Sequence, residues 1–264
     1  MNKEIVILGS SRGARNIIAG QIEEATGLST FNLSYPGSDI EFQEFLLRSL
    51  IHFNETPQKV LLAIDDPRQF LPSDLLIFRL ERLYPLARYP YINKEMIARG
   101  EKNISSKTLV LARMNIRNFD IRRKSFTYLD TITEYGSMPI YSQNENLTFN
   151  YDSLIHRYQT NNELEYKVNS FLKIQKICEE NNIELTLVFS PNFKAHNYSF
   201  ERRMKQLTHD NVDFILYDSL NPIYKDEAYF YDNFHLRSAG AITFTNEIVD
   251  FLESEKTNQL INTN

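Results

Sequence analysis

The sequence predicts a three-layer α/β/α sandwich around a five-stranded parallel sheet, with a large, mainly helical insertion. Three observations lead to this fold class. Short apolar runs alternate with helix-length amphipathic segments over the first 66 residues, and the alternation resumes over residues 164–252. Between these halves, residues 68–163 show no such alternation. Strands that alternate with helices form parallel sheets with right-handed crossovers and helices on both faces.

Each element of the first half has its own pattern. Residues 4–8 (EIVIL) form an apolar run that a glycine ends, which is typical of a buried strand. Residues 30–33 and 59–64 (KVLLAI) have the same character, and Pro follows each of them closely. Residues 15–25 place isoleucines on one helical face, and residues 41–53 carry Phe and Leu at helical spacing. This half therefore predicts three strands and two helices.

The second half continues the pattern with two strands and three helices. Residues 164–180 have apolar side chains near one side of a long helix. Residues 185–189 and 214–217 are strand-like, and residues 200–207 suit a helix between them. Residues 239–252 predict the final helix. Together the halves supply five strands.

Residues 68–163 are expected to form an insertion that covers one end of the sheet and acts as a lid. Apolar spacing predicts helices over 78–86 and 109–114. Residues 131–160 are rich in Asn, Ser and Tyr and predict loops. A connection of this length is rarely plain filler in a compact domain, which favours a functional role.

The prediction is one domain over residues 1–255, followed by a flexible, polar tail at 256–264. The chain has 264 residues and a single cysteine, Cys178, so it is not a disulfide-rich secreted scaffold. No apolar run approaches the roughly 20 residues that span a bilayer. The N-terminus lacks the pattern of a secretory leader. We therefore expect a cytoplasmic protein.

Charge is distributed unevenly along the chain. The net charge is −5, which argues against general nucleic-acid binding. Residues 79–124 hold 12 Lys and Arg against 4 acidic residues, so this window carries +8 and the remainder −13. Such a basic block suggests contact with an anionic glycan, a membrane surface or an acidic partner, and a solvated basic helical face is the alternative.

Three groups of polar residues follow predicted strands or precede the last helix. Ser11 lies in a Gly-Ser-Ser-Arg turn after the first strand, and Gly37 follows the second. Asp232 and His235 form the only Asp-x-x-His in the chain. Parallel strands bring their carboxyl ends to one edge, where a serine, an imidazole and a carboxylate would support nucleophilic catalysis. The alternatives are structural: a serine as helix N-cap, Asp232 as the cap of the last helix, and Gly37 as a turn residue.

These motifs resemble those of the SGNH, or GDSL-like, hydrolase superfamily, whose fold is flavodoxin-like. The resemblance covers about residues 3–66 and 164–252 and implies a catalytic triad of Ser11, Asp232 and His235. It also implies an oxyanion hole formed by the N–H groups of Ser11 and Gly37. Relatives with Gly-Ser-Ser in place of Gly-Asp-Ser act on cell-surface glycans.

The third family motif, Gly-x-Asn-Asp, here reads Ala-Ile-Asp65-Asp66, so the expected asparagine is absent. An ionised carboxylate beside an oxyanion would oppose the transition state. Asn192, after Ser-Pro, is a candidate replacement donor. Arg12 and Asp66 are candidate substrate contacts, with an exposed first-turn arginine as the plainer interpretation of Arg12.

The turn of Gly9-Ser-Ser-Arg-Gly-Ala-Arg15 also resembles the glycine-rich turn of short-chain dehydrogenases. Arg15 replaces the last glycine and would crowd a pyrophosphate, and no Tyr in the chain has Lys four residues later. The sequence therefore favours acyl-ester chemistry over dinucleotide binding. No pair of histidines has metal-ligand spacing, so no metal site is expected.

The functional prediction is a serine esterase or O-acyltransferase that acts on an O-acyl group, in particular an O-acetyl group, of a carbohydrate. The resemblance places such an enzyme in polysaccharide or cell-envelope glycan synthesis. It needs no cofactor, although acyl-CoA is a possible donor if the reaction is a transfer. The alternative is a catalytically inactive module that binds an anionic glycan or a partner.

Overall fold

The structure is a computed structural model that describes residues 2–109, 129, 131–143 and 149–262. The chain divides into a larger unit, Met1–Ile77 with Thr127–Asn264, and a smaller unit, Phe78–Phe126. The smaller unit lies within the predicted insertion of residues 68–163, whose limits stay a prediction. The role of the insertion as a lid stays a prediction.

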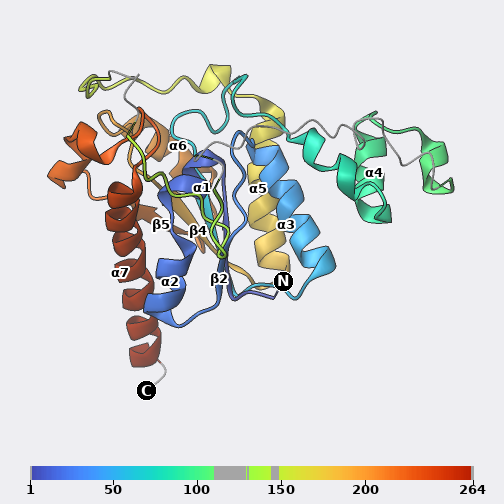
Figure 1. Cartoon of the computed structure of the whole chain (residues 1–264), viewed down its shortest axis with the longest axis horizontal. Helices are drawn as coiled ribbons and strands as arrows, with labels where there is room; N and C mark the ends of the chain where they lie inside the picture. Colours follow the sequence, from blue (N-terminus) through green and yellow to red (C-terminus); the bar gives the residue numbers. More distant parts are fainter. Residues whose placement is uncertain (1, 110–128, 130, 144–148, 263–264) are drawn as a thin grey trace. The chain divides into compact units, whose positions relative to one another are not determined.

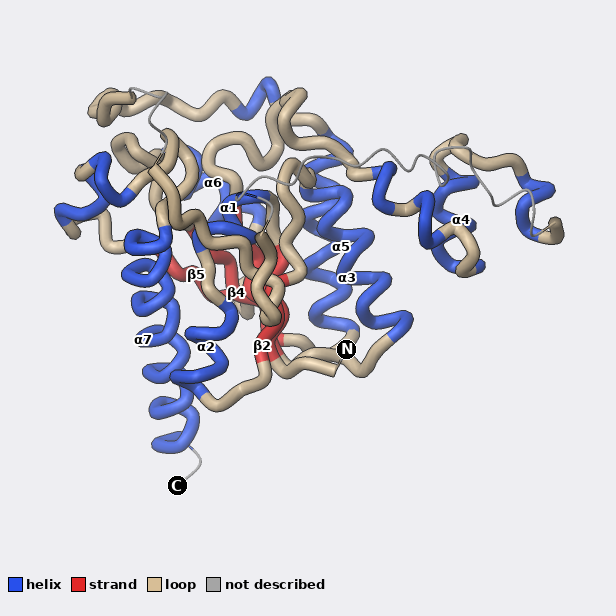
Figure 2. The backbone as a smooth tube through the Cα atoms, in the orientation of Figure 1, coloured by secondary structure: helices blue, strands red, loops and turns tan. Residues whose placement is uncertain are grey.

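The larger unit is built on a parallel sheet of five strands, drawn in red in Figure 2. The strands are β1 (Ile5–Leu8), β2 (Thr30–Asn32), β3 (Lys59–Ile64), β4 (Glu184–Phe189) and β5 (Asp213–Leu216). Their order is β2-β1-β3-β4-β5, and every neighbouring pair is parallel. The predicted α/β fold class is confirmed. Because the strands are parallel, their carboxyl ends all lie at one edge of the sheet.

Helices cover both faces of this sheet (Figure 1). The first face carries α3 (Ile40–Phe53), α5 (Glu165–Glu180) and α6 (Tyr198–Leu207). The second face carries α1 (Ser11–Asn16), α2 (Ala19–Thr26) and α7 (Ser238–Asn262).

Alternate strand residues separate the two layers of the core. Val6 and Leu8 pack toward α3 and α5, while Ile5 and Ile7 pack toward α2 and α7. This division follows from the period of two in an extended strand. Because both faces are covered, β1 and β3 are buried along their whole length, which explains their continuous apolar sequences.

The single helix predicted over residues 15–25 is in fact two helices, α1 and α2, with a break at Ile17 and Ile18. Ile17 has extended backbone angles, and Asn32 Nδ2 donates to its carbonyl at 3.0 Å. The N–H of Ile18 donates to Thr245 Oγ1 at 3.1 Å. Side chains from distant segments thus satisfy the backbone groups that a continuous helix would have paired.

The last helix extends beyond its predicted end at Leu252, so the predicted tail is helical as far as Asn262. Glu255 on this extension pairs with Lys59 Nζ at 2.6 Å, and Thr257 Oγ1 donates to the Glu253 carbonyl at 3.0 Å. The ion pair with Lys59 is a tertiary contact that the polar sequence of this segment does not predict.

The smaller unit is described up to residue 109, so most of the helix predicted over 109–114 lies outside the described residues. The helix predicted over 78–86 is instead two 3-10 turns, Leu80–Arg82 and Tyr84–Leu86. Pro85 explains the difference, since it has no N–H for a helical bond. The unit continues with α4 (Pro90–Ala98) and a 3-10 turn at Ile104–Lys107.

The remaining described segments are loops and short turns. The loop prediction for residues 131–160 is confirmed over 131–143 and 149–159, where only isolated bridges occur. Further 3-10 turns lie at Thr160–Asn162, Pro222–Lys225 and Glu227–Tyr229.

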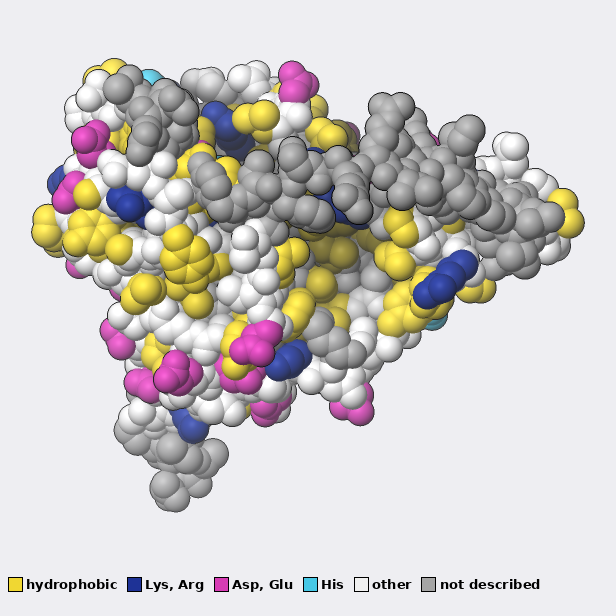
Figure 3. Space-filling view, in the orientation of Figure 1, with side chains coloured by type: hydrophobic (Ala, Val, Ile, Leu, Met, Phe, Trp, Pro, Cys, Tyr) yellow, Lys and Arg dark blue, Asp and Glu magenta, His cyan; other side chains and the backbone are white. Residues whose placement is uncertain are grey.

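Among the helices in the described ranges, none combines the length and apolarity needed to cross a membrane. Figure 3 shows acidic side chains gathered over α2 and the adjacent part of α7.

Candidate active site

Ser11 is the first residue of α1, directly after the turn that leaves β1. Ser10 caps the helix: its Oγ accepts the N–H of Arg12 at 3.3 Å and donates to Asp65 Oδ1 at 2.5 Å. The cap fixes the first turn, whose N–H groups have no partner inside the helix. The N-cap alternative therefore applies to Ser10, and the neighbouring Ser11 keeps its hydroxyl available for another contact.

Gly13 lets α1 lie close to the ends of the strands. A Cβ atom at this position would lie 2.4 Å from Ser34 Oγ and 3.0 Å from the Cβ of Ala63. Only a glycine fits such an approach. The helix that carries Ser11 is thus held against the carboxyl edge of the sheet.

Asp232 and His235 form a tight turn before α7. Asp232 Oδ1 accepts the N–H groups of Phe234 at 2.8 Å and His235 at 2.9 Å. The same turn brings both carboxylate oxygens within 2.9 Å of His235 Nδ1. Burial raises the pKa of Asp232, but the hydrogen bonds and charge of His235 outweigh that effect, and the pKa lies below its ordinary value. The carboxylate is therefore ionised and fixes the Nδ1 proton.

The other imidazole nitrogen meets the serine. His235 Nε2 lies 2.7 Å from Ser11 Oγ, across 224 positions in the sequence. The imidazole is 15% exposed, so it is sheltered but reachable. With Nδ1–H donated to Asp232, Nε2 accepts the hydroxyl proton of Ser11, which is the hydrogen-bond chain of a serine nucleophile with its base.

Asn16 connects the helix that carries Ser11 to the turn that carries His235, and it was not predicted from the sequence. Its Nδ2 donates to the Phe234 carbonyl at 3.3 Å and to Ser190 Oγ at 3.2 Å. Its Oδ1 accepts the N–H of Leu236 at 2.9 Å. One fully buried side chain on α1 therefore holds the turn that carries His235. The sign available in the sequence was a polar residue on the face of a short predicted helix that packs against the protein interior.

The structure places Gly37, one of the residues predicted to form an oxyanion hole, at the cavity that contains Ser11. Gly37 has φ of 74°, a conformation that favours glycine, and no backbone bond in the described part of the chain engages its N–H. It lines the same cavity as Ser11. Asn192 does not serve as the extra donor: its Nδ2 is 3.3 Å from both the carbonyl and Oδ2 of Asp66, and it is absent from the cavity lining.

Arg12 and Asp66 border the cavity, but their contacts are with the protein. Arg12 is 3% exposed, which corrects the expectation of an exposed first-turn arginine. Its Nε donates to Ser190 Oγ at 3.1 Å, its Nη1 to the Asp66 carbonyl at 3.2 Å, and its Nη2 to the Ser190 carbonyl. Asp66 is also buried and accepts from Asn192. Both residues hold loops together at the strand ends.

The cavity beside the triad has a volume of about 270 Å³. Residues from α1, from the loops after β2 and β3, and from the turn before α7 line it: Ser11, Arg12, Arg15, Pro36, Gly37, Asp65, Asp66, Arg68, Leu75, Leu76, Phe234 and His235. All of these segments follow strands or precede the last helix at one edge. Open parallel sheets place their ligands at this edge.

Asp65 occupies the place of the missing asparagine and is fully buried. Burial raises the pKa of this carboxyl, although Arg12, the hydrogen bond from Ser10 and His235 oppose the rise. A raised pKa reduces the negative charge beside the proposed oxyanion. It also links the group to stability, because its folded pKa lies above its unfolded value.

We predict that Asp65→Asn gains stability relative to the wild type as the pH rises. The contribution of Asp65 is fully present below its unfolded pKa, near 3.8, and is lost as the pH rises through its folded pKa. Each unit of elevation corresponds to about 1.4 kcal/mol. Urea unfolding of both proteins at several pH values between 4 and 8 measures this. A difference between the two that stays constant with pH would contradict the assignment.

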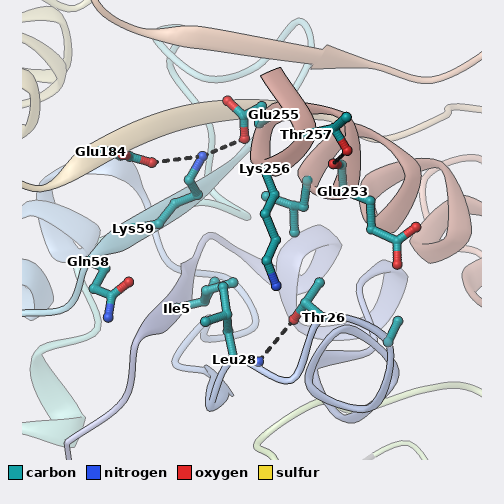
Figure 4. Close-up of a pocket in the computed structure, with 12 residues that line it drawn as sticks. Ile5, Thr26, Leu28, Gln58, Lys59, Glu184, Glu253, Glu255, Lys256 and Thr257 are labelled. Carbon is teal, nitrogen blue, oxygen red and sulfur yellow. Dashed lines mark hydrogen bonds and ion pairs between the residues drawn. The ribbon is translucent and has the colours of Figure 1, made fainter. Parts of the chain in front are cut away.

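A second, larger cavity of about 500 Å³ lies at the opposite edge of the sheet (Figure 4). Ile5 and Leu28 contribute apolar surface, and Lys59 lies 2.6 Å from Glu255 and 3.1 Å from Glu184. The positive charge of the Lys59 amine is therefore already balanced by two carboxylates. The cavity contains no serine or histidine, so its size does not make it the reactive site.

Comparisons with known proteins add no family assignment. No protein-family model matches the chain, and no curated protein sequence matches it. Within the described ranges, no group of three His, Cys, Asp or Glu side chains is arranged to hold a metal ion. The chemistry of this site is therefore inferred from its geometry and from the resemblance of its motifs.

Proposed function

We propose that this protein is a serine-dependent enzyme that hydrolyses or transfers an O-acyl group, in particular an O-acetyl group, on a carbohydrate. One observation carries the proposal: Asp232, His235 and Ser11 form a continuous hydrogen-bond chain at the carboxyl edge of the sheet. The carbohydrate substrate and a role in glycan synthesis come from the resemblance to the SGNH superfamily. A cytoplasmic location is part of the proposal, and cell fractionation tests it.

In the first half-reaction, Ser11 Oγ attacks the acyl carbonyl and its proton passes to His235 Nε2. The N–H groups of Ser11 and Gly37 stabilise the oxyanion. When the intermediate collapses, the ester C–O bond breaks and His235 protonates the departing alcohol. The acyl-enzyme then reacts with water or a sugar hydroxyl, whose proton His235 accepts; the bond between the acyl carbon and Ser11 Oγ then breaks, and His235 returns the proton to Oγ. The second acceptor would make the enzyme a transferase, with an acyl donor such as acyl-CoA.

A fluorophosphonate probe tests the proposal directly. We expect covalent labelling at Ser11, identified by peptide mass spectrometry, because Ser11 Oγ lies 2.7 Å from His235 Nε2. Ser11→Ala should lose the label, while Ser10→Ala should retain it. Absence of labelling in the wild type, together with salt-sensitive glycan binding, would favour the inactive binding module. Label on Ser10 would overturn the assignment of the nucleophile.

A further inference from the structure

Arg68 lies beside the candidate nucleophile but takes no part in the hydrogen-bond chain of the triad. It follows β3, is half-buried, and lines the same cavity as Ser11 and His235. Its guanidinium carbon lies 4.3 Å from the centroid of the Phe234 ring. Within the described part of the chain, no hydrogen bond or ion pair engages this guanidinium. A half-buried cation at a reactive site with no such partner points to a ligand.

The position of this cation is fixed by the same turn that fixes the base. Phe234 directly precedes His235; its N–H donates to Asp232 Oδ1 at 2.8 Å and its carbonyl accepts from Asn16 at 3.3 Å. An arginine whose guanidinium lies over such an immobilised ring is itself restrained. The guanidinium therefore stands at a defined place relative to His235.

The charged groups around Arg68 leave its cation available. Arg12 and Lys194 are close enough to affect Arg68 electrostatically, and both are cationic. Asp65 is an acidic group that interacts electrostatically with Arg68, and its Oδ1 is already bonded to Ser10. Burial raises the pKa of Asp65 and weakens its competition with an incoming anion.

We propose that Arg68, whose guanidinium lies over the Phe234 ring, selects acyl esters that carry a carboxylate or phosphate group near the ester bond. A guanidinium has N–H groups along its planar edge, and these match two oxygen atoms of such an anion. The proposal rests on the function proposed above and narrows its substrate class to acylated sugars with an acidic substituent.

Matched ester pairs test the proposal. We compare 4-acetoxybenzoate with its neutral methyl ester, and 4-acetoxyphenyl phosphate with the same neutral ester, using the ratio of kcat/KM values. A hydrogen bond to a charged group corresponds to about 10–100-fold in this ratio. The wild type should show such a preference in at least one pair, and the two pairs distinguish carboxylate from phosphate.

The Arg68 variants show whether this residue creates the preference. Arg68→Leu should bring the ratio close to one, and Arg68→Lys should restore it only in part, because lysine lacks the planar fork. Because both esters of a pair are measured with the same variant, a general loss of activity cancels in the ratio of their kcat/KM values. Arg202→Leu, which removes an exposed arginine from α6, is the matched control and should keep the wild-type ratio. A wild type without preference, or a full preference in Arg68→Leu, would overturn the proposal.

Failure of the proposed function would look different. If the wild type hydrolyses none of these esters, the enzyme assignment is wrong, and direct binding then decides the role of Arg68. Titration of 4-hydroxybenzoate, phenyl phosphate and methyl 4-hydroxybenzoate, followed by NMR, should show selective binding of an anion that Arg68→Leu loses. Equal binding of the three compounds would overturn the proposal for Arg68.

Discussion

Replacing Ser11 or His235 by alanine is expected to lower kcat for p-nitrophenyl acetate hydrolysis by at least about 10³-fold. The two groups are joined by one hydrogen bond of 2.7 Å and act in a single step. Without the hydroxyl, no acyl-enzyme forms. Without the imidazole, the hydroxyl has no group to accept its proton.

The double variant gives the sharper test. Because the serine and the histidine act as a unit, Ser11→Ala combined with His235→Ala should be no slower than either single variant. Independent contributions would instead multiply. A double variant much slower than both singles, or a single variant with full activity, would show that this pair is not the catalytic unit.

The second large effect concerns stability. Arg12→Met is expected to lower the free energy of unfolding by about 3–5 kcal/mol, because it removes one partner from a buried charged network. The guanidinium of Arg12 is bonded to Ser190 and Asp66, and it lies near the buried carboxyl group of Asp65. Methionine fills similar space but removes the N–H donors that Arg12 supplies to the Ser190 hydroxyl, the Ser190 carbonyl and the Asp66 carbonyl.

Urea unfolding followed by circular dichroism measures the loss. The control is Arg202→Met on α6, where the side chain is exposed and the expected change is within about 0.5 kcal/mol. Arg12→Lys should recover only part of the stability, since one amine cannot reach the same set of carbonyl oxygens. A loss below about 1 kcal/mol for Arg12→Met would show that these bonds do not hold the strand-end loops together.

The sheet could be predicted from the sequence because its strands are buried on both faces. The limits of β3 match the prediction, since the run VLLAI that follows Lys59 contains only apolar residues. The break between α1 and α2 could not be predicted in this way. It depends on Asn32 and Thr245, which reach the break only after the chain has folded.

The candidate site shows the same division. Ser11, Asp232 and His235 were predicted because their residue types and strand-end positions match a known chemistry, and the structure brings them together. The burial of Arg12 was not predicted, because the sequence around a first-turn arginine does not show which distant segments will cover it. Arg68 was also not predicted, because a single arginine in a polar loop belongs to no repeating sequence pattern.

The separation of 224 positions between Ser11 and His235 has a consequence for biosynthesis. The ribosome adds Ser11 to the growing chain 224 positions before it adds His235. A nascent or prematurely terminated chain that stops before residue 235 displays the hydroxyl without its base. In the proposed enzyme, reactivity therefore awaits synthesis of the segment that carries His235, and translation itself delays the onset of activity.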